Sequence, residues 1–277
     1  MNKRNNKFIK SCKICKNRKL KFAYKHDKKS YYVCVRCNFV FQNPIPSLNE
    51  LEVYYSKKFF DENYFNQNRE LKLRDKQYTL DKQILLKHFK DDKNKKILDY
   101  GCGNGNFLAK FKAKKFGFEF NKSAKLNKTI KKLSLVSIKK EKYDLIIMRG
   151  VIEHIPNFDE VVKGLCKRLK KGGFFYITAT PNTNNLTFLL SPKDFNQNDV
   201  RHIYHFNNVN LSMFFLQNNL FNIETVYQYA NTPYAKYLND FKFSKTQLRN
   251  FVSVNDIKSK SPPGVGNMIT SIFKKMI

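Results

Sequence analysis

The segment ILDYGCGNGNF, residues 97–107, constrains the fold more than any other part of the sequence. A short apolar run ends at Asp99, and a helical pattern follows after a turn with three glycines, Gly101, Gly103 and Gly105. Glycine lets a backbone turn sharply and approach a ligand closely. The next apolar run, FGFEF, contains a second acid, Glu119, 20 residues after Asp99. Strand, acid, glycines, helix, strand and acid in this order predict a parallel α/β sheet with a ligand at the carboxyl ends of its strands.

The same segment excludes two common phosphate-binding loops. The dinucleotide pattern G-x-G-x-x-G fails because Asn106 stands at its sixth position, and no G-x-x-x-x-G-K-[ST] loop occurs. A carboxylate at Asp99 would repel a pyrophosphate but suits a cationic ligand with an ammonium group. Glu119 stands where an acid can accept hydrogen bonds from both hydroxyls of a ribose.

Strand-like and helix-like patterns alternate along the remainder of the chain. Further strands are expected at 133–138, 143–150, 174–180 and 221–229. Helices are expected over most of 48–90 and at 122–132, 158–173 and 208–220. This alternation predicts a doubly wound, mostly parallel sheet.

Four of the six cysteines form two C-x-x-C pairs with 18 residues between them: Cys12, Cys15, Cys34 and Cys37. Each pair places two thiolates on one side of a tight turn, and a hairpin between the pairs completes a tetrahedral four-sulfur site. The alternatives are a redox pair and coincidence. Four protein ligands leave no open position, so the spacing predicts a structural zinc site in a ribbon-like module.

The chain carries 53 Lys plus Arg against 22 Asp plus Glu, a net charge of +31. Lys outnumbers Arg 44 to 9 and is scattered along the chain, as an AT-rich genome would impose, whereas nucleic-acid surfaces favour Arg. Residues 1–40 are denser, with 13 basic residues and one acid, Asp27, so a nucleic-acid or other anionic partner stays open for this segment. No apolar run is long enough to span a membrane, and no secretory signal begins the chain, which favours a cytoplasmic protein.

The ordered motifs resemble those of class I S-adenosylmethionine-dependent methyltransferases. ILDYGCGNGNFL, FGFEFN, YDLIIMRGVIEHIPN and LKKGGFFYITATPN are similar to successive motifs of that family, over residues 95–230. RHIYHF followed by FNIETV is similar to one branch acting on small molecules, whose members often carry an N-terminal C-x-x-C/C-x-x-C module. The resemblance implies a Rossmann-like seven-stranded-type sheet and S-adenosylmethionine as cofactor.

The resemblance also implies the residues that contact this cofactor. The expected set lies on and after the first, second and fourth strands: Asp99, Gly101, Cys102, Gly103, Gly105, Glu119, Phe120 and Met148. An acid that often holds the adenine amino group in the family is not evident here.

Three histidines are candidates for the general base that a hydroxyl acceptor requires: His154, His202 and His205. Each has a structural alternative as a packed or hydrogen-bonded side chain. A metal held by His202 and His205 is a further alternative that lacks a nearby third ligand. Arg149 and Arg201 are candidates for holding an anionic acceptor.

The sequence therefore predicts an O-methyltransferase acting on a small polar acceptor such as a sugar, a nucleotide-linked sugar or a surface-glycan precursor. An RNA methyltransferase that grips its substrate through the basic module is the alternative, and a non-catalytic scaffold is a third. The expected domains are a zinc-ribbon-like module, a helical linker or lid, the cofactor-binding domain and a C-terminal extension: 1–45, 46–93, 94–230 and 231–277.

Overall fold

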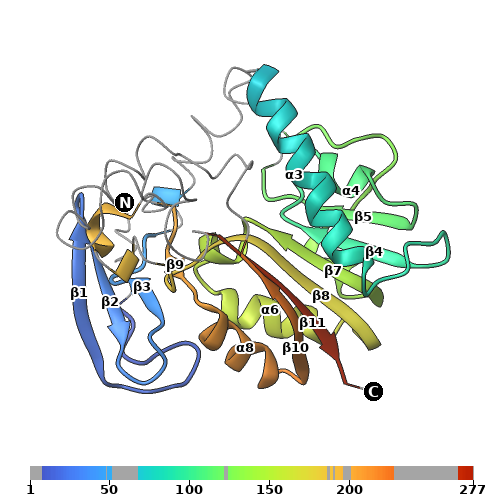
Figure 1. The fold of residues 1–277 in the computed structure, drawn as a ribbon. Coiled ribbons are helices and arrows are strands. Elements are labelled where there is room, and N and C mark those ends of the chain that lie inside the picture. The colour runs from blue at the N-terminus through green and yellow to red at the C-terminus, as the bar shows by residue number, and fades with distance from the viewer. Residues whose placement is uncertain are drawn as a thin grey trace, which may run out of the picture.

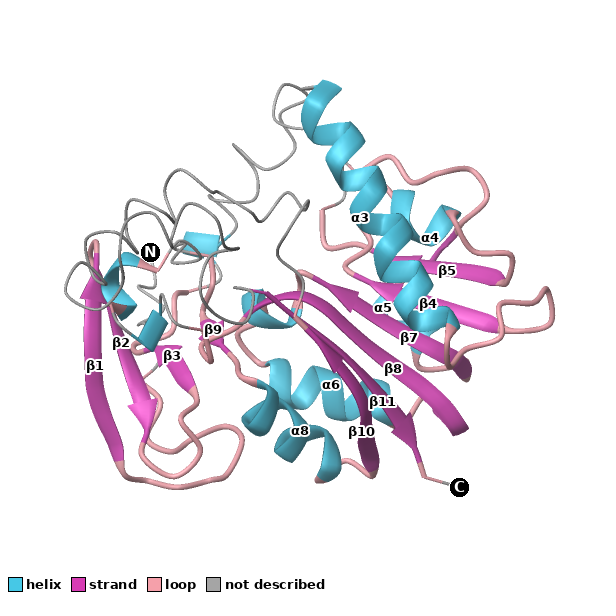
Figure 2. Ribbon diagram, viewed as in Figure 1, coloured by secondary structure: helices cyan, strands magenta, loops and turns pink. Residues whose placement is uncertain are grey.

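The computed structural model describes residues 8–47, 49–51, 68–121, 124–185, 188–189, 191–195, 201–227 and 268–276. Its strands are β1 (Leu20–His26), β2 (Lys29–Cys34), β3 (Val40–Gln42), β4 (Lys96–Tyr100), β5 (Lys114–Phe118), β6 (Lys131–Lys132), β7 (Tyr143–Arg149), β8 (Leu169–Pro181), β9 (Tyr204–His205), β10 (Leu220–Val226) and β11 (Met268–Lys275). Its helices are α3 (Asn68–Leu86), α4 (Asn106–Ala109), α5 (Leu135–Ile138), α6 (Phe158–Cys166) and α8 (Asn208–Leu216), with short 3-10 turns η1 (Ile152–His154) and η2 (Pro192–Asp194). Figures 1 and 2 show these elements arranged as a small sheet beside a large one.

The large sheet has seven strands in the order β10-β11-β8-β7-β4-β5-β6. The five strands from β8 to β6 pair in parallel, and β11 pairs antiparallel with both β10 and β8. The predicted mostly parallel, doubly wound sheet is confirmed. Among the helices described, none has the length and apolar character needed to cross a bilayer.

Each face of the large sheet packs against its own hydrophobic core. Along β7, Ile146 and Met148 contribute to one cluster, and Leu145 and Ile147 contribute to the other, as the two-residue period of a strand requires. The first cluster contains residues of α6 and α8, and the second contains residues of α3 and α4. Figure 1 shows these two pairs of helices against the sheet. Burial of both faces explains why β7 reads as one continuous apolar run.

The small sheet has the order β1-β2-β3-β9. We call residues 8–47 the ribbon, because β1, β2 and β3 follow one another as an antiparallel meander. The fourth strand, β9, comes from the part of the chain after β8 and pairs with β3 at Val40 and Phe41. The ribbon is therefore hydrogen-bonded to the rest of the protein, and its core residues Phe39 and Phe41 belong to the same cluster as Phe158 of α6.

Three sequence-based boundaries differ from the structure. Residues 133–138 were expected to form a strand, but Ser134 accepts a hydrogen bond from the Ser137 N–H at 3.2 Å and caps the one-turn helix α5. The expected helix 122–132 is absent over its described residues, 124–132, which end in β6. The helix expected to reach Gly173 ends at Cys166, and the LKKGG segment forms the irregular start of β8.

The end of the chain belongs to the large sheet. The predicted domain boundary at residue 230 leaves out β11, which lies between β10 and β8 and buries Ile269, Ile272 and Phe273. Apolar side chains on both faces make this strand a central element, so residues 268–275 are not a separate extension. The part of the expected extension before residue 268, and the part of the expected helix 48–90 at 52–67, lie outside the described residues.

Candidate functional site

The glycine turn after β4 has a backbone that only glycine adopts without strain. Gly101, Gly103 and Gly105 have φ angles of +83°, +56° and +81°. A side chain at Gly101 would meet Val151 at 2.6 Å, and one at Gly105 would collide with Ile130. At Gly103 nothing lies within 4 Å of the place a Cβ would take. The turn is thus packed at both ends and open at its middle glycine.

Asp99 lies at the carboxyl side of β4 directly before this turn. Its side chain is buried, and its Oδ1 atom has no hydrogen-bond partner within the described structure. Burial raises the pKa of this carboxyl to about 7, although the positive charge of Arg149 acts in the opposite direction. A buried carboxylate oxygen without a donor is costly, and an ammonium group of a ligand would supply the missing donor.

Glu119 follows β5, and its carboxylate lies against the middle of the glycine turn. Its Oε2 atom accepts from the Gly103 N–H at 2.7 Å, and its Oε1 atom accepts from the Asn121 N–H at 2.9 Å. Each carboxylate oxygen can accept a second hydrogen bond, so both remain able to receive a hydroxyl. The unpartnered oxygen of Asp99, the open position at Gly103 and the held carboxylate of Glu119 together fit a ligand with an ammonium group and a ribose.

The other predicted cofactor contacts have different surroundings. Phe120 is 54% exposed, and its ring lies roughly perpendicular to those of Phe118 and Tyr100, so part of it is accessible. Cys102 lies in the turn, and burial raises the pKa of its thiol far above the usual range, which suits a packing role. Met148, on β7, is completely buried in the core. These three assignments remain predictions.

Arg149, at the end of β7, is paired with an acid that the sequence reading missed. Its Nε atom lies 3.0 Å from Oδ2 of Asp81 on α3, and its guanidinium lies over the ring of Tyr78 at 4.6 Å. Asp81 is fully buried and also accepts from Gln77 at 2.7 Å. The sequence indicated only that Asp81 lies within the expected helical region 48–90. The pair joins α3 to the end of β7.

The loop after β7 brings His154 together with His202. The two ring centroids are 4.6 Å apart, and Nδ1 of His154 lies 3.0 Å from the Arg201 carbonyl oxygen. The carboxylate of Glu153 lies near both rings; Glu153 is 1% exposed and accepts from the Thr180 hydroxyl at 3.2 Å. Burial raises the pKa of the Glu153 carboxyl to about 8. Glu153 was not a predicted site residue, and the structure alone shows that it faces both histidines.

His205, the third predicted base, lies on β9 inside the contact between the ribbon and the large domain. Its ring stacks on Tyr31 with centroids 5.3 Å apart, and its Nδ1 atom lies 3.3 Å from the Tyr24 hydroxyl. Complete burial lowers its pKa well below the usual value of 6.5. A general base must reach its substrate, and these surroundings agree better with the structural alternative. The catalytic role of each of the three histidines remains a prediction.

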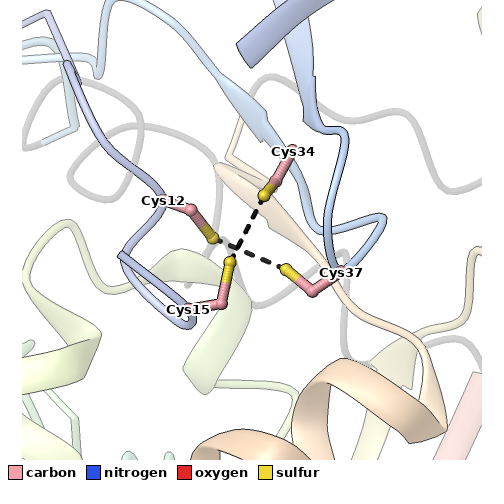
Figure 3. A group of neighbouring side chains, drawn as sticks. All are labelled: Cys12, Cys15, Cys34 and Cys37. Carbon is pink, nitrogen blue, oxygen red and sulfur yellow. Dashed lines mark hydrogen bonds between the residues drawn. The ribbon is translucent and has the colours of Figure 1, made fainter. Parts of the chain in front are cut away.

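The four predicted metal-binding cysteines converge in the ribbon (Figure 3). Sγ of Cys12 lies 3.6 Å from that of Cys37, and Sγ of Cys15 lies 3.4 Å from that of Cys34. Four sulfurs around a tetrahedral zinc ion, each at about 2.3 Å, are separated by about 3.8 Å. The donor set and its spacing therefore fit zinc.

The two cysteine turns have the same local structure. The residues that follow them, Lys16 and Asn38, both have left-handed backbones, with φ angles of +60° and +54°. The N–H of each residue donates to the carbonyl of the first cysteine of its pair, at 3.0 Å for Lys16 and 2.9 Å for Asn38. This repeated turn directs both thiols of a pair to one side.

Comparison with known proteins identifies the large domain. The sequence model of a family described as "Methyltransferase domain" matches residues 69–225, more than half of the 277 residues. The chain is also 28% identical over 123 residues to a curated protein of Hydrogenovibrio crunogenus named ubiquinone biosynthesis O-methyltransferase. That match covers 38% of this chain and 51% of the relative, so the chain spans about half the relative's length.

Solved structures share the fold at low sequence identity. The 1,6-didemethyltoxoflavin-N1-methyltransferase of Burkholderia thailandensis, with bound 1,6-didemethyltoxoflavin and S-adenosylhomocysteine, is similar with a TM-score of 0.52 and 10% identity, covering 93% of this chain and 100% of that one. Phosphoethanolamine N-methyltransferase 2 of Haemonchus contortus, in complex with phosphomonomethylethanolamine and S-adenosylhomocysteine, is similar with a TM-score of 0.50 and 16% identity, covering 72% and 53%. Likeness at this level concerns the fold alone.

Proposed function

The chain belongs to the methyltransferase-domain family, and we propose that it transfers a methyl group from S-adenosylmethionine to a hydroxyl of a small polar acceptor. The observation that supports the cofactor assignment is the turn between Asp99 and Glu119, where Asp99 has a buried carboxylate oxygen without a hydrogen-bond partner and the backbone is open at Gly103. The sulfonium of the cofactor supplies an activated methyl group when bound. The protein then has to bind, align and shield the reactants.

Each group of the cofactor has a counterpart in the site. Asp99 would accept from the ammonium group, and the two oxygens of Glu119 would accept from the ribose hydroxyls. The exposed ring face of Phe120 would stack on the adenine. Gly101, Gly103 and Gly105 let the backbone approach, and Cys102 would line the same turn, whereas Met148 is buried in the core.

The acceptor is proposed as a sugar, a nucleotide-linked sugar or a related glycan precursor. A hydroxyl acceptor must lose its proton, and the partly exposed imidazole of His154 follows β7, at the carboxyl end of the sheet. The imidazole of His202, which is also partly exposed and directly precedes β9, lies against it. The partial match to a curated O-methyltransferase supports oxygen as the methylated atom. We further propose that the four cysteines hold a structural zinc ion, that residues 1–45 act as one module with it, and that α3 belongs to a lid over the site.

The ribose assignment predicts that Glu119→Ala weakens S-adenosylhomocysteine binding at least tenfold. A hydrogen-bonded charged group contributes roughly 1.5–3 kcal/mol, which corresponds to this factor or more. Isothermal titration calorimetry measures the affinity, and methyl transfer to nucleotide sugars is measured in parallel. Glu141→Ala is the matched control, because Glu141 forms only a surface ion pair with Lys96. Unchanged affinity of the Glu119 variant would refute the ribose assignment.

RNA methylation remains the second candidate because the ribbon exposes many basic side chains. Exposed examples are Lys10, Lys16, Arg18, Lys19, Lys21, Lys25, Lys28 and Arg36. Binding through phosphate contacts weakens steeply between about 50 and 200 mM salt, whereas turnover of a small acceptor changes little. Methyl transfer to RNA alone, with that steep salt dependence, would replace the small-acceptor proposal.

A further inference from the structure

Three ligand-type side chains meet beside the cofactor turn, and cofactor binding makes no use of them. One carboxylate oxygen of Glu153 and one ring nitrogen each of His154 and His202 lie within 4.8 Å of one another. Glu153 is buried, whereas both histidines are partly exposed, so solvent reaches one side of the cluster. We propose that Glu153, His154 and His202 bind one divalent metal ion of the zinc class.

The hydrogen bond of His154 decides which ring nitrogen faces the cluster. Its Nδ1 atom lies 3.0 Å from the Arg201 carbonyl oxygen, which can only accept, so Nδ1 carries the proton. The Nε2 atom of the neutral ring then presents a lone pair at 3.7 Å from Oε1 of Glu153. This separation is too long for a hydrogen bond, and it is close to the roughly 3.4 Å between two nitrogen or oxygen ligands of a tetrahedral zinc ion.

Glu153 is held by groups other than the histidines. The Thr180 hydroxyl donates to its Oε2 atom at 3.2 Å and leaves Oε1 as the atom near His154. The Ile203 N–H donates to the Glu153 carbonyl oxygen at 2.9 Å, which ties the backbone beside His202 to the backbone of Glu153. Partners of this kind orient the ligands of metal sites.

The ribbon positions His202, the third proposed ligand, through Gln42. The side-chain amide of Gln42 donates to the His202 carbonyl oxygen at 3.0 Å, and its backbone N–H donates to the Ile203 carbonyl oxygen at 2.8 Å. Gln42 is fully buried at the end of β3. The position of His202 is therefore set from one side by the ribbon and from the other by Glu153.

The donor set selects the kind of metal. Magnesium and calcium prefer all-oxygen ligands, whereas two imidazoles and one carboxylate suit zinc and its first-row neighbours. Three protein ligands leave a coordination position open. This part of the inference rests on the proposed function: the open position would take the acceptor hydroxyl, whose pKa the metal would lower. The hydroxyl proton would pass to solvent water, the oxygen would form the new bond to the methyl group, and the methyl–sulfur bond would break to leave S-adenosylhomocysteine. His154 and His202 then act as ligands instead of general bases.

The test measures zinc directly on the full chain. After removal of loosely bound metal, inductively coupled plasma mass spectrometry should find two zinc ions per wild-type chain and one in Glu153→Gln and in His202→Ala. Calorimetric titration with zinc chloride should show an affinity loss of about 100-fold or more, because loss of an outer-shell partner alone costs roughly 10–100-fold. His88→Ala is the control, since His88 pairs with Glu224 at 2.7 Å and faces neither cluster.

A second measurement distinguishes loss of the second metal site from general misfolding of a variant. In the cobalt-substituted protein, the cysteine cluster gives strong thiolate charge-transfer bands, and only the weaker bands without thiolate character should disappear in His202→Ala. Equal zinc content and equal affinity in wild type and both variants would overturn the metal site. A wild type that binds the second zinc but releases no S-adenosylhomocysteine with any acceptor would contradict the proposed function instead.

Discussion

The structure contains two clusters of metal-type ligands, and they differ in how complete they are. The cysteine cluster has four identical donors from two turns that repeat the same backbone, and three of the four side chains are buried. The second cluster has three mixed donors, Glu153, His154 and His202, with both histidines partly exposed. A complete donor set stabilises a fold, whereas an incomplete one leaves room for a ligand.

The two clusters are also connected. Gln42 ends the strand that follows the cysteines, and its amide reaches the His202 backbone. Asn210 of α8 donates to the Cys37 carbonyl oxygen at 3.4 Å, and Lys13 pairs with Asp159 of α6. The ribbon thus positions part of the second cluster, so damage to the first should reach the second but not the reverse.

The largest effect is expected from Cys34→Ser. Loss of a ligand from the closed cluster should release its zinc, unfold the ribbon and remove the support of His202, at a cost of about 4 kcal/mol or more. Zinc content and thermal unfolding measure this. Cys166→Ala is the control, because that buried cysteine lies on α6 away from the cluster. If Cys34→Ser kept the zinc content and melting temperature of the wild type, the cysteine cluster would not be a structural site, and the contrast between the two clusters would fail.

An intermediate effect is expected from Gln42→Leu, which tests the connection. The substitution removes the donor of the buried His202 carbonyl, at a cost of about 1–3 kcal/mol, and should weaken zinc at the second cluster roughly tenfold. The zinc of the cysteine cluster should stay. Gln217→Leu, at an exposed glutamine after α8, is the control. Unchanged affinity at the second cluster would mean that the ribbon does not position it.

The smallest effect is expected from Lys13→Ala. Its amino group lies 2.6 Å from Asp159, near the ribbon surface, and ion pairs of this type contribute about 1 kcal/mol or less. Asp159 stands in the first turn of α6, where the helix dipole keeps it favourable without the lysine. Chemical denaturation compares this variant with Lys10→Ala. If Lys13→Ala lowered the free energy of unfolding by well over about 2 kcal/mol, the ion pair, and not Gln42 alone, would connect the ribbon to the rest of the protein.

The sequence predicted the sites whose residues lie close together in the chain, namely the cysteine cluster and the glycine turn. The spacing of Cys12, Cys15, Cys34 and Cys37 contains the geometry of two turns, and their convergence agrees with it. The order of Asp99, the glycines and Glu119 similarly predicts two neighbouring parallel strands, and β4 pairs with β5. Both patterns depend on the backbone conformation of short segments, which is set by residues that are neighbours in the sequence.

Other parts depend on contacts between distant segments. A short apolar run such as 133–138 is compatible with either a strand or a helix. Here the hydrogen bond of the Ser134 cap stabilises the helix. Asp81 and Arg149 are 68 residues apart, and Glu153 and His202 meet only because Ile203 pairs with the Glu153 backbone. Nothing in the local pattern around these residues indicates their partners.

The insertion of β11 has a consequence for how the protein is made. Among the described strands, β10 pairs only with β11, and β8 has β7 as its other neighbour. During synthesis, residues 268–275 leave the ribosome after every other strand of the sheet, so until then β8 and β10 expose unpaired edges that invite misassociation. The strand delivered last is therefore the second from one edge of the sheet, with a neighbour on each side, and a nascent chain depends on protection of the edges of β8 and β10 until translation has delivered it.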